Sequence, residues 1–175
     1  EIIALRVLEA YGINPDKDIV KQRLGVSEAV NALKDRKIDA FIHNAAIPIP
    51  AVIDLAASPG TKIRFVDHSD AVTTMNKKYG PLYSKGTLPQ NTYPGQGKDA
   101  ATVDVWAVLL TDDKISDQSA YNIVKTLFEK KPDLMLVARD TAYMTYENQF
   151  GGASPIPFHP GALKYFAEKG YKPKP

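Results

Sequence analysis

Apolar and polar positions follow two alternating patterns through residues 2–66. Apolar residues recur at helical spacing in three stretches, which predict helices over residues 2–11, 28–36 and 48–57. Short, compact apolar runs predict strands over residues 19–24, 38–42 and 63–66. Strands that alternate with helices are typical of a mainly parallel α/β sheet, and we expect that architecture in this part of the chain.

The pattern changes between residues 84 and 101, because strand and helix alternate before this stretch and helices dominate after it. A helix predicted over residues 69–79 precedes the stretch, and the apolar run 103–110 predicts a buried strand after it. A strand at this point would carry the chain from one lobe to another. We therefore expect two lobes, residues 1–104 and residues 105–175.

The second lobe is predicted to be mainly helical. Ser116 has a side chain suited to a helix N-cap, and it precedes a helix that runs to about residue 130. Further helical stretches are predicted from Pro132, around Tyr143 and over residues 162–169, with a break over residues 151–157. His159 stands immediately before the last of these helices, so we expect it to cap or pack rather than to do chemistry.

A loop rich in proline and glycine, residues 86–97, fits neither the helical nor the strand pattern. Tyr93 offers a phenol and Gln96 an amide, and both suit the wall of a small-molecule site. The alternative is a surface connection in which both side chains bond only within their own turn. We predict ligand contacts for Tyr93 and Gln96 and leave this alternative open.

A polar pair follows the apolar run 38–42 at its carboxyl end. In open parallel sheets ligands bind outside the carboxyl ends of the strands, which is where His43 and Asn44 are expected to lie. Both side chains donate and accept hydrogen bonds. The alternative is that Asn44 caps the next helix and His43 only packs.

Other candidate chemistry is sparse. His68 stands in an Asp-His-Ser-Asp run with no metal-site spacing, and a helix start capped by Ser69 accounts for it better. The sequence contains no nucleophile elbow, no phosphate-binding glycine loop and no His-Glu-x-x-His motif. We therefore expect no metal and no cofactor.

Composition excludes several classes of protein. The chain has no cysteine, which removes disulfides, Cys-ligated zinc and thiol catalysis. Its net charge is +2 and no basic block is present, so nucleic acid is not an expected partner. No apolar run approaches the ~20 residues that a membrane span needs, so no direct membrane insertion is expected. The chain begins at Glu1 without methionine and almost at once enters the first predicted helix, and we read it as a piece of a longer protein.

Six segments together carry a resemblance to a known family. In chain order they are residues 6–12, 27–35, 37–41, 92–96, 121–129 and 155–162. With these segments the chain is similar to the C-terminal portion of TAXI-type solute receptors, the extracytoplasmic binding subunits of one class of tripartite ATP-independent (TRAP) transporters. The resemblance covers nearly the whole chain.

This resemblance implies a type II periplasmic-binding-protein fold, in which two α/β lobes face each other across a ligand cleft. Residues 1–104 would form most of the second, ligand-binding lobe. Residues 105–175 would return to complete the first lobe, whose N-terminal part is missing here. The implied location is the bacterial periplasm or another extracytoplasmic space.

The resemblance also implies a ligand and partners. The ligand would be a small organic anion or amino acid, glutamate-like or a dicarboxylate, and the membrane subunits of a TRAP transporter would be the protein partners. The retained ligand contacts would be His43, Asn44, Ala45, Tyr93 and Gln96. On this reading the chain captures a ligand without catalysis.

Two other functions remain open from the sequence. An enzyme on the same two-lobed fold, such as a lyase or dehydratase, could use His43 as acid and base, although no paired carboxylates lie near it in the sequence. A sensor domain that passes lobe closure to a signalling partner would share the same fold.

Overall fold

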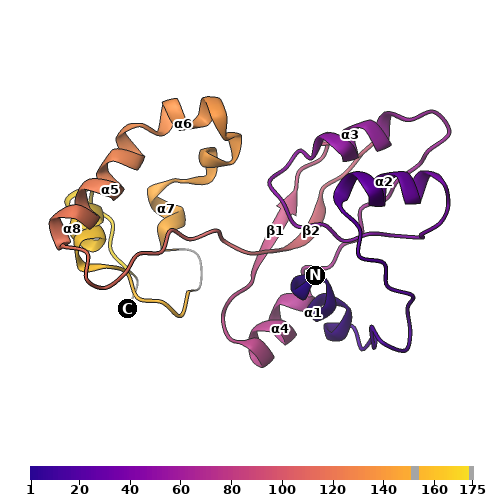
Figure 1. The fold of residues 1–175 in the computed structure, drawn as a ribbon, viewed down its shortest axis with the longest axis horizontal. Coiled ribbons are helices and arrows are strands. Elements are labelled where there is room, and N and C mark those ends of the chain that lie inside the picture. Colours follow the sequence, from indigo (N-terminus) through magenta and orange to yellow (C-terminus); the bar gives the residue numbers. More distant parts are fainter. Residues whose placement is uncertain (151–153, 174–175) are drawn as a thin grey trace. The chain divides into compact units, whose positions relative to one another are not determined.

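The computed structural model describes residues 1–150 and 154–173. The chain forms two compact units, one of residues 1–80 and 84–104 and the other of residues 81–83 and 105–175 (Figure 1). Along the chain, one boundary between the two units lies between Asp104 and Val105.

The first unit contains four helices and a pair of strands among its described residues. Its helices are α1 (Ile2–Ala10), α2 (Val26–Lys34), α3 (Pro50–Ala57) and α4 (Ala71–Tyr79). Strands β1 (Ser84–Leu88) and β2 (Ala100–Asp104) pair antiparallel, with Ser84 opposite Asp104 and Leu88 opposite Ala100. Helix α1 packs against α4, and α2 packs against α3 (Figure 1).

The helix boundaries follow local signals in the sequence. Pro50 occupies the first turn of α3, where its missing N–H costs no intrahelical bond. Gly80 ends α4 with a φ of 88°, a conformation that glycine adopts without steric cost. Helix α2 starts earlier than predicted. Its N-cap is Gly25, whose N–H donates to the Glu28 carboxylate at 2.9 Å, so Ser27 lies within the first turn.

The strands predicted over residues 19–24, 38–42 and 63–66 are absent from the described structure. The pair β1–β2 is its only sheet and is antiparallel, so these residues do not form the predicted parallel sheet. An apolar run becomes a strand only where a neighbouring backbone completes its hydrogen bonds, and no strand within residues 1–150 and 154–173 pairs with these three runs. Phe41, Ile63 and Phe65 are nevertheless half-buried against the core of the unit.

The strand predicted over residues 103–110 is shifted and shorter. Strand β2 begins at Ala100 and ends at Asp104, and residues 105–110 lie in no helix or strand. Several large apolar side chains of this segment are exposed, by 40% for Trp106 and 71% for Leu109.

The second unit is helical in its described residues. It contains α5 (Asp117–Glu129), α6 (Lys131–Val137), the 3₁₀ helix η1 (Arg139–Tyr143), α7 (Tyr146–Gln149) and α8 (Pro160–Glu168). The predicted cap of α5 is confirmed, since the Ser116 hydroxyl accepts the Ser119 N–H at 3.1 Å. The capping role of His159 is also confirmed, because its Nδ1 accepts the Gly161 N–H at 3.2 Å. The predicted break over residues 151–157 lies partly outside the described residues.

Aromatic side chains form the core of the second unit. Tyr165 and Phe166 of α8 are 1% and 2% exposed, and they lie against Phe128 of α5 and Tyr146 of α7. The hydroxyls of Tyr146 and Tyr165 are 3.0 Å apart, and burial raises the pKa of Tyr165. The packing of α5 against α8 therefore carries the apolar burial that stabilises this unit.

Candidate functional site

Tyr93 lies in the loop that joins β1 to β2 and is 3% exposed. Its ring stacks on Phe65 with the centroids 5.1 Å apart. Its hydroxyl accepts the Ile49 N–H at 2.9 Å, which ties the loop to the start of α3. Tyr93 is therefore part of a buried cluster with Val52, Leu88 and Ala100. Its role as a ligand contact stays a prediction.

Gln96 is also buried, and its amide holds the two ends of the same loop together. Its Nε2 donates to the Leu88 carbonyl at 3.3 Å and to the Lys98 carbonyl at 3.1 Å. These two acceptors fix the orientation of the amide, because a flip would place Oε1 against both carbonyl oxygens. In this orientation Oε1 is buried and has no hydrogen-bond partner among the described residues. Such an acceptor is costly unless a donor reaches it.

The predicted contacts His43, Asn44 and Ala45 are all exposed and lie in no helix or strand. Phe41 before them and Ile47 after them pack against the cluster that contains Tyr93. The structure thus brings this exposed turn to the same core as the Tyr93 loop. The N-cap of α3 is Ile49, so Asn44 does not cap that helix.

The structure corrects the prediction for His68. Helix α4 begins at Ala71 with Asp70 as its N-cap, and no side chain bonds across that cap, so Ser69 does not serve as one. His68 Nδ1 lies 2.8 Å from the Val66 carbonyl oxygen. Within the described ranges, no group of three or more His, Cys, Asp or Glu side chains could hold a metal ion.

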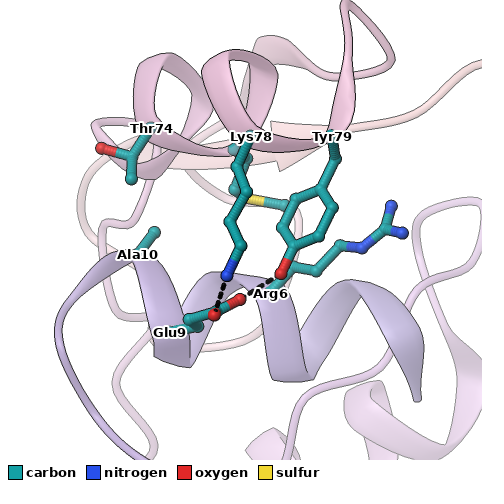
Figure 2. Close-up of a pocket in the computed structure, with 7 residues that line it drawn as sticks. Arg6, Glu9, Ala10, Thr74, Lys78 and Tyr79 are labelled. Carbon is teal, nitrogen blue, oxygen red and sulfur yellow. Dashed lines mark hydrogen bonds and ion pairs between the residues drawn. The ribbon is translucent and has the colours of Figure 1, made fainter.

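A pocket that the sequence did not predict lies between α1 and α4 (Figure 2). Its volume is about 250 Å³, and its lining residues are Arg6, Glu9, Ala10, Thr74, Met75, Lys78 and Tyr79. On each helix these residues are three to four positions apart or adjacent, which places them on one face. That spacing was readable in the sequence, but the pairing of two helices so far apart along the chain was not.

Charged groups organise this pocket. The Glu9 carboxylate accepts hydrogen bonds from the Lys78 ammonium and the Tyr79 hydroxyl (Figure 2). These bonds lower the pKa of Glu9, that of Lys78 having the larger effect, and the bond to Glu9 raises the pKa of Lys78. The guanidinium of Arg6 lies 3.9 Å from the centre of the Tyr79 ring, a cation–π contact.

The low pKa of Glu9 leads to a prediction for the variant Lys78→Gln. Removing the ammonium is expected to raise the Glu9 pKa toward its ordinary value of 4.5. In the wild type the pair stabilises the fold above that value, and this contribution is lost as the pH falls through the lowered pKa. Carboxyl NMR titration of Glu9 measures the shift. Lys77→Gln is the matched control, and an equal shift in both variants would show that the pair is not its cause.

Comparison with known proteins gives the class of this chain. The sequence pattern of the NMT1-like family matches residues 1–170. The chain therefore belongs to the NMT1-like family, a periplasmic solute-binding family related to the binding proteins of ABC and TRAP transporters. Members of the family are binding proteins, generally without enzymatic activity, and they typically act outside the cytoplasm with a small-molecule ligand and transporter partners.

In the part of the chain that the structure describes, no helix combines the length and the apolarity required to cross a membrane.

Proposed function

We propose that this protein is a TAXI-type solute receptor that captures a small organic anion or amino acid for a TRAP-type transporter. The observation that carries the proposal is the family match over residues 1–170. The ordered segments that resemble TAXI receptors support the finer assignment. The receptor would have a type II periplasmic-binding-protein fold, with residues 1–104 in the ligand-binding lobe and residues 105–175 completing the other.

The ligand site would lie on the first unit, where two predicted groups of contacts share one core. His43, Asn44 and Ala45 would supply exposed polar and backbone groups. Tyr93 would position the neighbouring loop through its bond to Ile49. Ligand binding would stabilise a closed form of the receptor, which requires higher affinity for that form than for the open one.

Gln96 favours one class within the proposed ligands. Its Oε1 is an acceptor in a fixed orientation that lacks a donor. An amino acid offers an ammonium group as donor, whereas a fully ionised dicarboxylate offers none. Because Oε1 is buried, a ligand reaches it only through a shift of the loop. We therefore propose a glutamate-like amino acid rather than a dicarboxylate.

Calorimetric titration with glutamate and with glutarate, which lacks the ammonium group, tests this choice. Glutamate is expected to bind at least roughly tenfold more tightly, because it adds a charge-assisted hydrogen bond. The variant Gln96→Met should reduce the preference for glutamate over glutarate. Gln90 is an exposed glutamine of the same loop, and the variant Gln90→Met should keep that preference.

The outcomes separate the two levels of the proposal. Equal affinity for glutamate and glutarate would remove the role of Gln96 and leave the receptor function standing. No binding of any amino acid or dicarboxylate, together with substrate turnover, would contradict the receptor function and favour an enzyme.

A further inference from the structure

We propose that His159 is a pH-sensitive joint between α5 and α8, which caps α8 when its ring is neutral and pairs with Asp117 when its ring is protonated. The ring joins the N-termini of these two helices in the second unit, and its side chain is 16% exposed. Histidine is the side chain that ordinarily changes charge between pH 5 and 8. The inference uses no residue of the proposed solute site and stands apart from the receptor function.

Hydrogen bonds at both ring nitrogens define the neutral form. Nδ1 lies 3.2 Å from the backbone nitrogen of Gly161, and because that N–H can only donate, Nδ1 is the acceptor. Nε2 lies 3.2 Å from the carbonyl oxygen of Ile115, which can only accept, so Nε2 carries the proton. A second proton would have to bind Nδ1, where it would face the Gly161 N–H. The cap bond and the protonated ring therefore exclude each other.

The Gly161 N–H depends on this cap. Pro160, the residue before it, has no N–H, and the Leu163 N–H already donates to the His159 carbonyl at 3.1 Å. Gly161 is buried, and a Cβ on it would lie 2.1 Å from the backbone oxygen of Asp117 in α5. A buried N–H that loses its acceptor needs another one. We therefore expect the first turn of α8 to open to water when Nδ1 is protonated.

Asp117 offers the protonated ring a new acceptor. Its Oδ1 lies 3.7 Å from Nδ1, and its side chain is 71% exposed, which leaves it room to close the remaining distance. The other charged residues nearby in the sequence are Asp112 and Lys114, before α5, and Lys164 on α8, whose ammonium lies 5.6 Å from the centre of an aromatic ring of α5. The positive ends of two helix dipoles disfavour a cation here, so the Asp117 carboxylate is the group that would stabilise it.

NMR of the 175-residue chain between pH 8 and pH 5 tests the joint. The Gly161 amide resonance is expected to shift with the same midpoint as the His159 ring. Its protection from exchange, corrected for the intrinsic rate at each pH, should fall roughly fivefold as one cap is lost. His68 is the comparison within the same molecule. Its Nδ1 lies 2.8 Å from the Val66 carbonyl oxygen and keeps that bond when Nε2 takes a proton, so amides beside His68 should stay protected.

Variants separate the cap from its titration. His159→Asn supplies a capping oxygen that does not titrate, so the protection of Gly161 should be the same at both ends of the pH range. Asp117→Asn removes the new acceptor and should move the change at Gly161 to lower pH. Asp113→Asn removes the same charge from an exposed residue four positions earlier and should leave the change where it is in the wild type.

Three results would overturn the proposal. The first is a Gly161 amide that does not respond to the titration of His159. The second is an equal loss of protection in His159→Asn, which would show that the cap does not carry the pH dependence. The third is identical behaviour of Asp117→Asn and Asp113→Asn, which would show that the protonated ring does not pair with Asp117.

Discussion

Replacing Gly161 with alanine is expected to destabilise the second unit by about 1–3 kcal/mol or more, the range for overpacked sites. A Cβ at this position would lie 2.1 Å from the carbonyl oxygen of Asp117. Because that atom is backbone at the start of α5, no side chain can turn aside to relieve the clash. Helix α8 would have to move away from α5 and open the aromatic core of Tyr165 and Phe166.

Hydrogen exchange with mass spectrometry localises this effect. Peptides from α5 and α8 should lose protection in Gly161→Ala, while peptides from the first unit keep theirs. Gly97→Ala is the control, since no atom lies within 4 Å of its added Cβ and the position has no positive φ. Unchanged protection of α5 and α8 in Gly161→Ala would show that the close approach of the two helices is not required.

Replacing Tyr93 with alanine is expected to cost the first unit about 3–5 kcal/mol, the usual cost of removing a buried aromatic side chain. The change removes the stack on Phe65 and the acceptor of the Ile49 N–H. The variant Tyr93→Phe keeps the ring and removes only the acceptor, which should cost about 1–3 kcal/mol.

Urea denaturation measures the loss of stability in each variant, which should be larger for Tyr93→Ala than for Tyr93→Phe. Hydrogen exchange measured on peptides from the first unit then shows whether that unit is the part destabilised. The same two variants distinguish an effect on folding from an effect on ligand binding. Weaker glutamate affinity in Tyr93→Ala alone would reflect lost structure, whereas weaker glutamate affinity in a folded Tyr93→Phe would point to a ligand contact of the hydroxyl. Equal stability of Tyr93→Ala and the wild type would contradict the buried role of the ring.

The sequence predicted helices better than strands, because the signals that start a helix act over a few residues whereas the partner of a strand can be far away in the sequence. The caps at Ser116 and His159 act on amides only two or three residues away, so they can be read locally. Residues 38–42 carry the composition of a strand, but a strand also needs a partner backbone, and that partner can lie anywhere in the chain. Among the described residues only β1 and β2 find such partners.

The sequence indicated the loop of the candidate site but not how that loop packs, for the same reason. Tyr93 and Gln96 stood out because they occupy an irregular loop, and the structure places both in that loop. Their burial depends on Phe65 and Leu88, whose proximity no local pattern reveals. The contact of Glu9 with Lys78 and Tyr79 was likewise hidden, since it joins residues that are 69 and 70 positions apart in the sequence.

The segment of residues 105–110 has a practical consequence for handling the protein. It is a run of six apolar residues with no charge and no proline, much of it in contact with water. Segments of this composition stack into cross-β fibrils when they are accessible to one another. We therefore expect concentrated solutions of this chain to aggregate at temperatures below the midpoint of thermal unfolding. The variant Val108→Lys is expected to stay soluble for longer under the same conditions.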